Sequence, residues 1–486
     1  MCTTETTTEV RPGREFDELV ARAVTAIDDL ALAGRRLAVM GENCADTLVA
    51  HLGALSAGVS SVPVPRYLGV DEIVYILRDS GAGALLSGPQ TAATAQKAAA
   101  EAGVADLRFD RWLAPAPSAP QVDRPARTLL VYTSGTTGRP KGTEMRWLRS
   151  LPATVGEHLE AVAAGSPFPP GPHLVVGPLH HTGPLSALRH ALAGGTVVVL
   201  GRFEPEAVLR AVQEHGAAST VMVPTHFSRL LALPAEVRAR YDVSSLRKVV
   251  HTGAACPVEV KRAMIEWWGP VLSEAYGGSE SGTVCAIESA DWLAHPGSVG
   301  RAVAGFETLI LGEDGRTLPP GEEGALWFRD LTGRGVQYHG VECGGGPSQA
   351  PEPGLFSLGE IGRVDADGFV YITDRQSDMV VSGGVNLYPA EVEAALSQHP
   401  AVADVAVIGV PHADMGEALR ALVVPVPGVP QPSADDLDAF CRERLAGPKC
   451  PRSYELVETV GRNAMGKVDK RALRRPYWPT ARTIGG

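Results

Sequence analysis

The feature that most constrains this chain is a loop rich in glycine and threonine, Tyr-Thr-Ser-Gly-Thr-Thr-Gly-Arg-Pro-Lys-Gly, at residues 132–142. It follows the apolar run 128–131, which predicts a buried strand. Glycines expose backbone N–H groups, hydroxyls donate hydrogen bonds, and Lys141 adds a cation, so the segment predicts a phosphate-binding loop. Its spacing is not that of the nucleotide-binding loop ending in Gly-Lys. The structural alternative is a flexible surface turn. The residues expected to bind phosphate are Thr133, Ser134, Gly135, Thr136, Thr137, Gly138 and Lys141.

Length and composition narrow the class of protein. A chain of 486 residues predicts at least two domains, because a single core stops growing near ~250–300 residues. The net charge of −11 argues against nucleic acid as a partner. The seven cysteines are scattered and odd in number, which favours reduced thiols. The sequence contains neither a signal peptide nor an apolar run near the ~20 residues of a membrane span, so we expect a cytoplasmic protein.

The order of the predicted elements indicates an α/β fold. Apolar residues recur at helical spacing over 16–32, 43–58 and 70–80, and apolar strands are expected at 36–40 and 59–64. Alternating strands and helices predict a mostly parallel sheet covered by helices. After residue 377 the strands and helices become short and form an α+β module.

A second chemical centre lies at residues 273–282, Ser-Glu-Ala-Tyr-Gly-Gly-Ser-Glu-Ser-Gly. The Ser279 hydroxyl can donate to an α-phosphate, and the Glu280 carboxylate is the oxygen ligand that Mg²⁺ prefers beside phosphate oxygens. Tyr276, followed by Gly277, can stack its ring on adenine. The alternative is an acidic surface turn.

Both segments resemble signature motifs of the ANL superfamily of adenylate-forming enzymes, which contains acyl- and aryl-CoA synthetases, adenylation domains and luciferases. The run 259–270 looks most like that of fatty-acyl and bile-acid-type CoA ligases. The resemblance extends from about residue 36 to about residue 475. It implies a large N-terminal domain for ATP and acid, residues 1–376, and a small mobile C-terminal domain, 377–486, joined at a hinge, Ser377.

The resemblance also implies roles for individual residues. Gly253, Ala254 and Ala255 would form a wall of the adenine pocket. Arg375 would bind ribose and phosphate, and Glu360 stands where the superfamily has an aspartate that holds the ribose hydroxyls. In the C-terminal domain, Lys467 would activate the acid, and Gly383 and Gly384 would line the tunnel for the pantetheine arm of CoA. The segment 331–354 departs from the superfamily pattern and has the composition of a flexible loop.

Three histidines are expected near the acid and CoA, namely His181, His226 and His251. His181 lies where the superfamily places an aromatic residue or histidine beside the acyl pocket; a packed or exposed histidine is the alternative. The mixture of residues around these positions does not separate a fatty acid from an aromatic or polycyclic one.

The function implied by the resemblance is ATP-dependent formation of acyl-AMP, followed by transfer to the thiol of CoA. The catalytic residues would be Lys467, Glu280, Arg375 and Ser279, with ATP, Mg²⁺ and CoA as cofactors. A second hypothesis passes the activated group to a carrier protein, an amine or another nucleophile. A third is a nucleotide-binding protein without turnover, although the four charged residues Lys141, Glu280, Arg375 and Lys467 argue against it.

Overall fold

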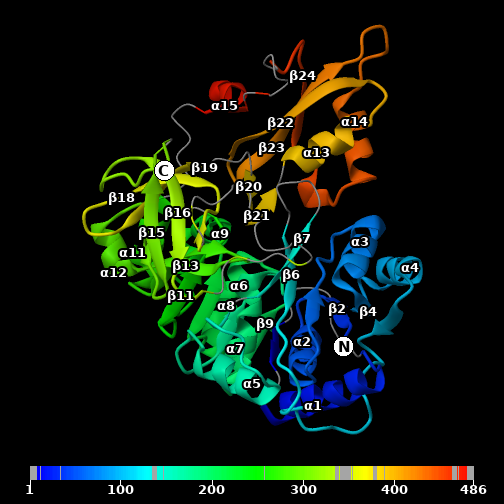
Figure 1. Ribbon diagram of the computed structural model, residues 1–486. Helices are drawn as coiled ribbons and strands as arrows, with labels where there is room; N and C mark the ends of the chain where they lie inside the picture. The colour runs from blue at the N-terminus through cyan, green and yellow to red at the C-terminus, as the bar shows by residue number, and fades with distance from the viewer. Residues whose placement is uncertain are drawn as a thin grey trace.

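The structure is a computed structural model. It describes residues 8–478 except 11–12, 33, 134–139, 146, 255, 257, 313, 334–335, 337–338, 340–351, 353, 376–379, 388, 462–467 and 469. Three main sheets and one hairpin organise the chain, with the small C-terminal sheet standing apart from the larger N-terminal part (Figure 1). This is the α/β architecture that the sequence predicts.

The first sheet is parallel and has the strand order β3-β2-β4-β5. Its strands are β2 (Arg36–Met40), β3 (Ser61–Pro63), β4 (Ala82–Ser87) and β5 (Ala105–Arg108). Helices α1 (Gly13–Asp29), α2 (Ala45–Ser56), α3 (Val70–Ser80) and α4 (Ala92–Ala102) alternate with them. The predicted strand at 36–40 and helix at 70–80 are confirmed with the same bounds. α3 ends where the sequence requires it, because Gly81 takes the left-handed conformation (φ 65°) that closes a helix.

The second sheet changes character at its middle. Its order is β1-β9-β8-β10-β11-β12-β13-β14-β19-β18-β16-β15, with β17 beside β16. The run from β9 to β12 is parallel, and the remaining pairs are antiparallel. The parallel strands are β8 (His173–Val175), β9 (Val197–Leu200), β10 (Ser219–Met222), β11 (Lys248–His251) and β12 (Leu272–Gly278). The others are β1 (Thr8–Val10), β13 (Gly282–Glu288), β14 (Ser298–Ala302), β15 (Phe306–Leu311), β16 (Gly324–Asp330), β17 (Leu355–Phe356), β18 (Glu360–Val364) and β19 (Val370–Arg375).

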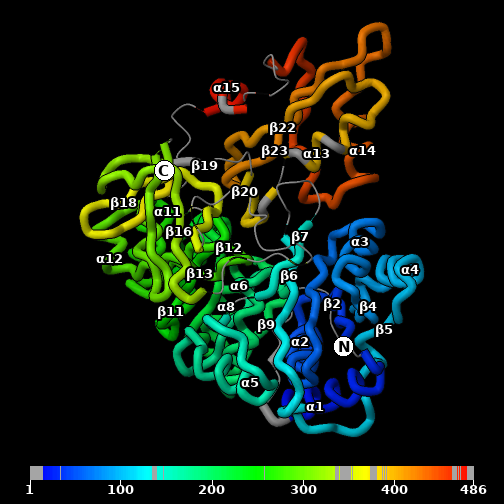
Figure 2. Tube along the Cα trace, in the orientation of Figure 1, coloured from blue at the N-terminus to red at the C-terminus, as the bar shows by residue number. Residues whose placement is uncertain are grey.

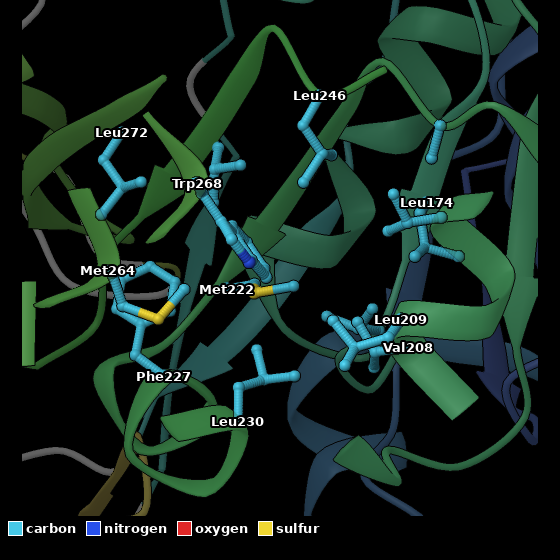
Figure 3. Packing of buried hydrophobic residues seen from close by; sticks show 14 of the residues in the cluster. Leu174, Val208, Leu209, Met222, Phe227, Leu230, Leu246, Met264, Trp268 and Leu272 are labelled. Carbon is cyan, nitrogen blue, oxygen red and sulfur yellow. The ribbon is translucent and has the colours of Figure 1, made fainter. Parts of the chain in front are cut away.

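Helices cover the parallel half of this sheet. They are α5 (Val155–Ala164), α6 (Thr182–Leu185), α7 (Ala187–Leu192), α8 (Pro205–His215), α9 (Pro224–Leu231), α10 (Ala235–Arg238), α11 (Val258–Trp268) and α12 (Ser289–Ala294). Figure 3 shows the core between this half-sheet and its helices, where Met222, Phe227, Met264 and Trp268 pack together. Since parallel strands end at one edge of the sheet, the loops after β10, β11 and β12 lie side by side.

The C-terminal sheet has the order β21-β20-β23-β22, with β24 parallel to β23. Its strands are β20 (Val380–Ser382), β21 (Val385–Leu387), β22 (Val402–His412), β23 (Gly416–Pro425) and β24 (Ser453–Leu456). The accompanying helices are α13 (Pro389–Leu396), α14 (Ala434–Arg442), the 3₁₀ turn η1 (Gly447–Lys449), α15 (Lys470–Arg474) and η2 (Arg475–Tyr477). This is the short α+β module expected after residue 377.

Two further sequence expectations meet the structure here. Within the described ranges, no helix is long and apolar enough to cross a membrane. Cys256, Cys285, Cys441 and Cys450 are free and buried. Cys44 is disulfide-bonded, which the scatter of the cysteines did not predict.

Candidate active site

The segment predicted to bind phosphate is flanked by two paired strands. Strand β6 (Leu130–Thr133) pairs antiparallel with β7 (Lys141–Glu144), and Thr133 lies directly opposite Lys141. The predicted residues Ser134, Gly135, Thr136, Thr137 and Gly138 lie outside the described residues. Thr133 and Lys141, two of the residues predicted to bind phosphate, therefore lie side by side where the two strands end.

Helix α3 supports both ends of this loop, which the sequence did not reveal. The Tyr75 hydroxyl donates to the carbonyl oxygen of Pro140 at 3.0 Å. The Tyr132 hydroxyl donates to Asp79 Oδ2 at 2.6 Å. Burial raises the pKa of Tyr132, and its bond to Asp79 raises it further. Tyr75 and Asp79 are four residues apart on one helix face, so a single rigid element fixes both ends of the loop.

The opposite side of the hairpin is held by His339. Its backbone N–H donates to the carbonyl oxygen of Gly142 at 2.7 Å. A Cβ at position 142 would lie 3.2 Å from both His339 Cβ and Tyr132 Cζ. A larger residue at 142 would therefore have to displace these neighbours by a few tenths of an ångström.

The second centre is the tight turn between β12 and β13. A Cβ on Gly277 would lie 1.9 Å from the carbonyl oxygen of Gly282, so only glycine fits there. The Ser281 hydroxyl accepts from the Gly278 N–H at 2.9 Å and donates to the Gly282 carbonyl oxygen at 2.9 Å. Ser279 and Glu280 are half-buried at the tip. The Glu280 carboxylate folds back over Gly278, within 2.8 Å of the place a Cβ would occupy.

Tyr276 and Glu360, predicted separately for adenine and ribose, are in direct contact. The Tyr276 hydroxyl donates to Glu360 Oε2 at 2.8 Å. Glu360 is 5% exposed and lies opposite Arg375 in the pairing of β18 with β19. The structure therefore brings β12 and these two antiparallel strands together at the Glu360 carboxylate.

The loop after β11 forms the adjoining wall. The Thr252 hydroxyl donates to the Ala275 carbonyl oxygen at 2.7 Å and fixes the loop to β12. Gly253 has φ +83°, a conformation that favours glycine, and it is followed by Ala254. Ala255 lies outside the described residues.

A turn of the C-terminal sheet reaches this wall. Gly383 and Gly384 form the β20–β21 turn with φ +56° and +80°. A Cβ on Gly384 would lie 3.0–3.2 Å from three side-chain atoms of Val223, and its carbonyl oxygen lies 3.9 Å from the Cβ position of Gly253. Gly383 N–H donates to the Met415 carbonyl oxygen at 2.9 Å. Two segments more than a hundred residues apart in sequence thus meet at Val223.

His181 lies beside this wall, at the start of α6. Burial lowers the pKa of His181 to about 4, so the ring is neutral at pH 7. A Cβ on Gly183, two residues on, would lie 3.1 Å from Val221 Cγ1 and 3.5 Å from Thr252 Cγ2. The α6 segment therefore packs on the same face of the sheet as Val221 and Thr252.

His226 and His251 have different neighbours from His181. His226 stacks on Phe203, with ring centroids 4.0 Å apart, and its Nδ1 accepts from Val223 N–H at 3.4 Å. His251 is fully buried and pairs in register with Met222 of the core. Alternate residues of a strand face opposite sides of a sheet, so His251 points away from the face that α6 covers. The structure does not bring these two rings together with His181.

A buried ion pair joins helix α11 to strand β12. Lys261 of α11 is fully buried, and its Nζ lies 2.6 Å from Glu274 Oε2 and 4.8 Å from the centre of the Trp292 ring. His251 Nε2 lies 3.5 Å from the same carboxylate oxygen. Burial raises the pKa of Glu274 although Lys261 opposes the shift, and burial lowers that of His251 well below its usual range. This pair was not predicted from the sequence, because the pattern of α11 is that of an ordinary amphipathic helix.

The remaining predicted residues have no described side chains. Arg375 is placed by its backbone alone, and Ser377 and Lys467 lie outside the described residues. Among the described residues, no group of three or more His, Cys, Asp or Glu side chains could hold a metal ion. Glu280 alone is predicted as a Mg²⁺ ligand, and a single carboxylate fits this ion only together with phosphate oxygens of a nucleotide, which is the common mode of binding.

The segments predicted for a nucleotide, namely the hairpin at 130–144, the turn after β12 and the loop after β11, are those compared next with known proteins. The chain belongs to the AMP-binding enzyme family: the model of the family matches residues 13–334, and that of the AMP-binding enzyme C-terminal domain matches residues 391–467. The protein is accordingly an adenylate-forming acid ligase.

Curated relatives cover almost the whole chain. Feruloyl-CoA synthases of Amycolatopsis sp. and Streptomyces sp. are each 33% identical over 475 residues, covering 95% of this chain and 94% of the relative. A fatty acid–acyl-carrier-protein ligase, ScoC, of Streptomyces coeruleorubidus is 32% identical, covering 92% of this chain and 87% of its own.

Solved structures show the same fold. The amide bond synthetase McbA of Marinactinospora thermotolerans has a TM-score of 0.82 and 28% identity, covering 96% of this chain and 95% of its own. The o-succinylbenzoate CoA synthetase of Bacillus subtilis (a double mutant) with a product analogue, OSB-NCoA, scores 0.79 at 28% identity, with 95% and 92% covered. The same enzyme with its acyl-adenylate scores 0.63 at 27% identity, with 97% and 93% covered.

Proposed function

We propose that this protein converts a carboxylic acid and ATP to acyl-AMP and pyrophosphate, and then transfers the acyl group to the thiol of CoA. The observation that carries the second step is the contact of Gly384 with Val223 beside Gly253. This contact supports the proposal because the turn that resembles a pantetheine-tunnel segment lies next to the loop that would cover the adenine.

The first step requires two anions to be held together. A carboxylate oxygen attacks the α-phosphorus of ATP, and pyrophosphate leaves with the electron pair of the broken P–O bond. Lys141 and the hydroxyl of Thr133 bind phosphate at the hairpin, and Ser279 donates to the α-phosphate. Each fixed donor acts in a water-poor site, where removing one typically costs roughly 10²–10³ in rate. Mg²⁺, held by Glu280 through phosphate oxygens, would neutralise charge on the pyrophosphate.

Other residues hold the nucleoside and the acid. Glu360 and Arg375 would bind the ribose, and the backbone of Gly253, Ala254 and Ala255 would cover the adenine. The neutral His181 ring lies next to the acid, where an uncharged side chain does not compete with Lys467 for the carboxylate. Lys467 activates the acid in this proposal, and the C-terminal part, 377–486, turns about Ser377 between the two steps.

The second step breaks the acyl–phosphate bond. The thiol of CoA loses its proton and attacks the acyl carbon, and AMP leaves. The TM-scores against two structures of the Bacillus subtilis enzyme support this second step. They are 0.79 with the CoA product analogue and 0.63 with the acyl-adenylate, at almost equal sequence identity. The present arrangement is thus more similar to the chain with a CoA product analogue than to the chain with an acyl-adenylate.

The test is mass spectrometry of purified protein with Mg-ATP and a pool of hydroxycinnamic and fatty acids, with and without CoA. The expected result is one class of acyl-CoA, formed only when CoA is present. Acyl-AMP that accumulates regardless of CoA would contradict the acceptor and leave the first step standing.

A matched variant separates the two steps. Lys467→Ala is expected to lose ATP-dependent adenylation by at least about a hundredfold, yet to form thioester from supplied acyl-AMP at close to the wild-type rate. Equal loss of both reactions would contradict the assignment of Lys467 to the first step.

A second candidate acceptor is favoured by a specific comparison. The amide bond synthetase aligns with a TM-score of 0.82, and one curated relative is a ligase for a carrier protein. Adding a pool of amines, or a carrier protein with its pantetheine arm, to the same mixture distinguishes these acceptors, since the mass of each product differs.

A further inference from the structure

Lys449 lies between the N-terminal and C-terminal parts of the molecule. Its Nζ donates to Glu391 Oε1 of α13 at 2.7 Å and to Glu72 Oε1 of α3 at 2.8 Å. The residue is 8% exposed, and both carboxylate side chains are at most 16% exposed. One bond stays within the C-terminal part, whereas the other crosses to a residue 377 positions away in sequence.

The surroundings of this contact are apolar. Ala446, just before η1, belongs to the same buried cluster as Ile73 of α3 and Leu130 of β6, with Tyr75 and Tyr132 packed against it. Figure 2 shows α3 and the β6–β7 hairpin on the side of the N-terminal part that faces the C-terminal strands. The C-terminal part therefore docks on the same helix that holds the phosphate hairpin through Tyr75 and Asp79.

Packed side chains connect the contact at Lys449 with His181, the histidine beside the proposed acid pocket. Tyr67 is near enough to Lys449, Glu72 and Glu391 for their charges to affect its pKa, which burial raises. The Tyr67 ring meets His180 edge-on, with centroids 5.5 Å apart, and His180 lies 4.4 Å from His181. A chain of packed side chains thus runs from Lys449 to the histidine beside the proposed acid pocket.

Lys449 keeps its positive charge over the neutral range, because its pKa is raised. Burial lowers the pKa of Lys449, but the two carboxylates outweigh it and the net shift is upward. Burial raises the pKa of Glu391, and the positive charge of Lys449 opposes this shift. When the two parts separate, water solvates all three groups, so the cross-boundary bond contributes only part of its Coulomb energy.

We propose that Lys449 is a positioning residue for acyl transfer: its bond to Glu72 holds the C-terminal part in the arrangement that places Gly384 against Val223. This inference rests on the proposed function, because it assigns the docked arrangement to the second step. Lys449 touches no reacting atom, and it acts through the position of the β20–β21 turn.

The matched variants are Glu72→Gln and Glu391→Gln. Each removes one negative charge beside the same ammonium at almost the same distance, yet only Glu72→Gln removes the ion pair that crosses the boundary. Glu72→Gln also leaves Lys449 paired with Glu391, so no buried charge is left alone. Both glutamines keep the size of the side chain, which limits effects on folding.

Two half-reactions are measured in single turnover. Pyrophosphate release without CoA should stay within about twofold of wild type in both variants. Transfer from preformed acyl-AMP to CoA should fall about tenfold in Glu72→Gln and less than about threefold in Glu391→Gln, in the range of typical coupling between sites. Equal effects of the two variants on transfer, or equal loss of both half-reactions in Glu72→Gln, would overturn the proposal.

A distance measurement tests the same inference without any acceptor. Dyes on Val122→Cys and Val429→Cys, both exposed positions, report the separation of the two parts by single-molecule energy transfer. Glu72→Gln should reduce the population with the wild-type docked distance about tenfold relative to the separated population, and Glu391→Gln should not. An unchanged distribution in Glu72→Gln would overturn the proposal. Failure of the proposed function would appear instead in the wild type, as an absence of acyl-CoA.

Discussion

Two buried lysines of this protein differ in what surrounds them. Lys261 is 0% exposed inside the core, with one carboxylate at 2.6 Å and the Trp292 ring as its neighbours. Lys449 is 8% exposed at a boundary, with two carboxylates, one from each side. The partners of Lys261 cannot reach water unless the domain unfolds, whereas those of Lys449 reach it when two parts separate. The same ionic unit therefore stabilises the fold in one place and selects an arrangement in the other.

The largest expected effect comes from breaking the interior pair. Lys261→Met leaves Glu274 buried without its cation, and we expect the free energy of unfolding to fall by about 3–5 kcal/mol. Denaturation by urea measures it. Lys449→Met is the matched control, and it should lose about 1 kcal/mol or less because Glu72 and Glu391 can be hydrated at a boundary. Similar losses in the two variants would remove the distinction drawn here.

Lowering the pH is expected to destabilise the fold through a histidine buried in its interior, His173. Burial lowers the pKa of His173 to about 3, from an ordinary value of 6.5. Between these values the unfolded chain binds more protons than the folded one, so stability is fully present above about pH 6.5 and falls as the pH decreases. At pH 5 the loss is about 2 kcal/mol for this histidine. Urea denaturation of wild type and His173→Gln at pH 7 and 5 checks it, and parallel pH dependence in the two proteins would refute it.

A smaller effect concerns the support of the phosphate hairpin by α3. Tyr132→Phe removes the hydroxyl bonded to Asp79, and the net value of one such bond is about 1 kcal/mol, equivalent to about fivefold weaker ATP binding. Isothermal titration with a non-hydrolysable ATP analogue measures it. Tyr241→Phe is the control, because its hydroxyl donates to Glu206 at 2.7 Å far along the chain from the hairpin. Equal weakening by both variants would indicate a general effect of losing a tyrosine hydroxyl.

The smallest expected effect belongs to the second ion pair across the boundary. Arg229 of α9 binds Asp414 through two bonds, of 3.0 and 2.7 Å, but the side chains are 38% and 51% exposed. Exposed pairs contribute about 0–1 kcal/mol and are screened by salt. Arg229→Met should slow acyl transfer by less than about threefold, with a difference that vanishes near 1 M salt. If Arg229→Met slowed acyl transfer more than Glu72→Gln does, the main contact that holds the C-terminal part would be the one between Arg229 and Asp414.

Local patterns in the sequence predicted the parts of the fold that depend on neighbouring residues. The helix at 70–80 has apolar spacing, acidic residues in its first turn and a glycine at its end, and its bounds are confirmed. The expected strand at 128–131 is displaced to Leu130–Thr133, because pairing with β7 extends it into the hairpin. The antiparallel half of the large sheet was not predicted, since strand direction depends on partners far along the chain.

The site divides in the same way. Loops such as 132–142 and 273–282 carry their chemistry in consecutive residues, so they could be found by reading along the chain. The bond from Tyr276 to Glu360 joins residues 84 positions apart, and the bond from Lys449 to Glu72 joins residues 377 apart. Tyr276 and Glu360 were each predicted for a role of their own but their contact was not, and Lys449 and Glu72 are unremarkable in their own segments. A lysine after Gly-Pro reads as an exposed turn, and only the fold shows that it lies between two carboxylates.

The contact between Gly384 and Val223 has a consequence for motion. It is made by van der Waals surfaces, and an aliphatic side chain can be approached from many directions at nearly equal energy. The β20–β21 turn can therefore move relative to the Val223 side chain without breaking a hydrogen bond to that side chain. The energetic cost of moving the C-terminal part then arises at Lys449 and Arg229, which must exchange their carboxylate partners for water. It does not arise at the contact between Gly384 and Val223.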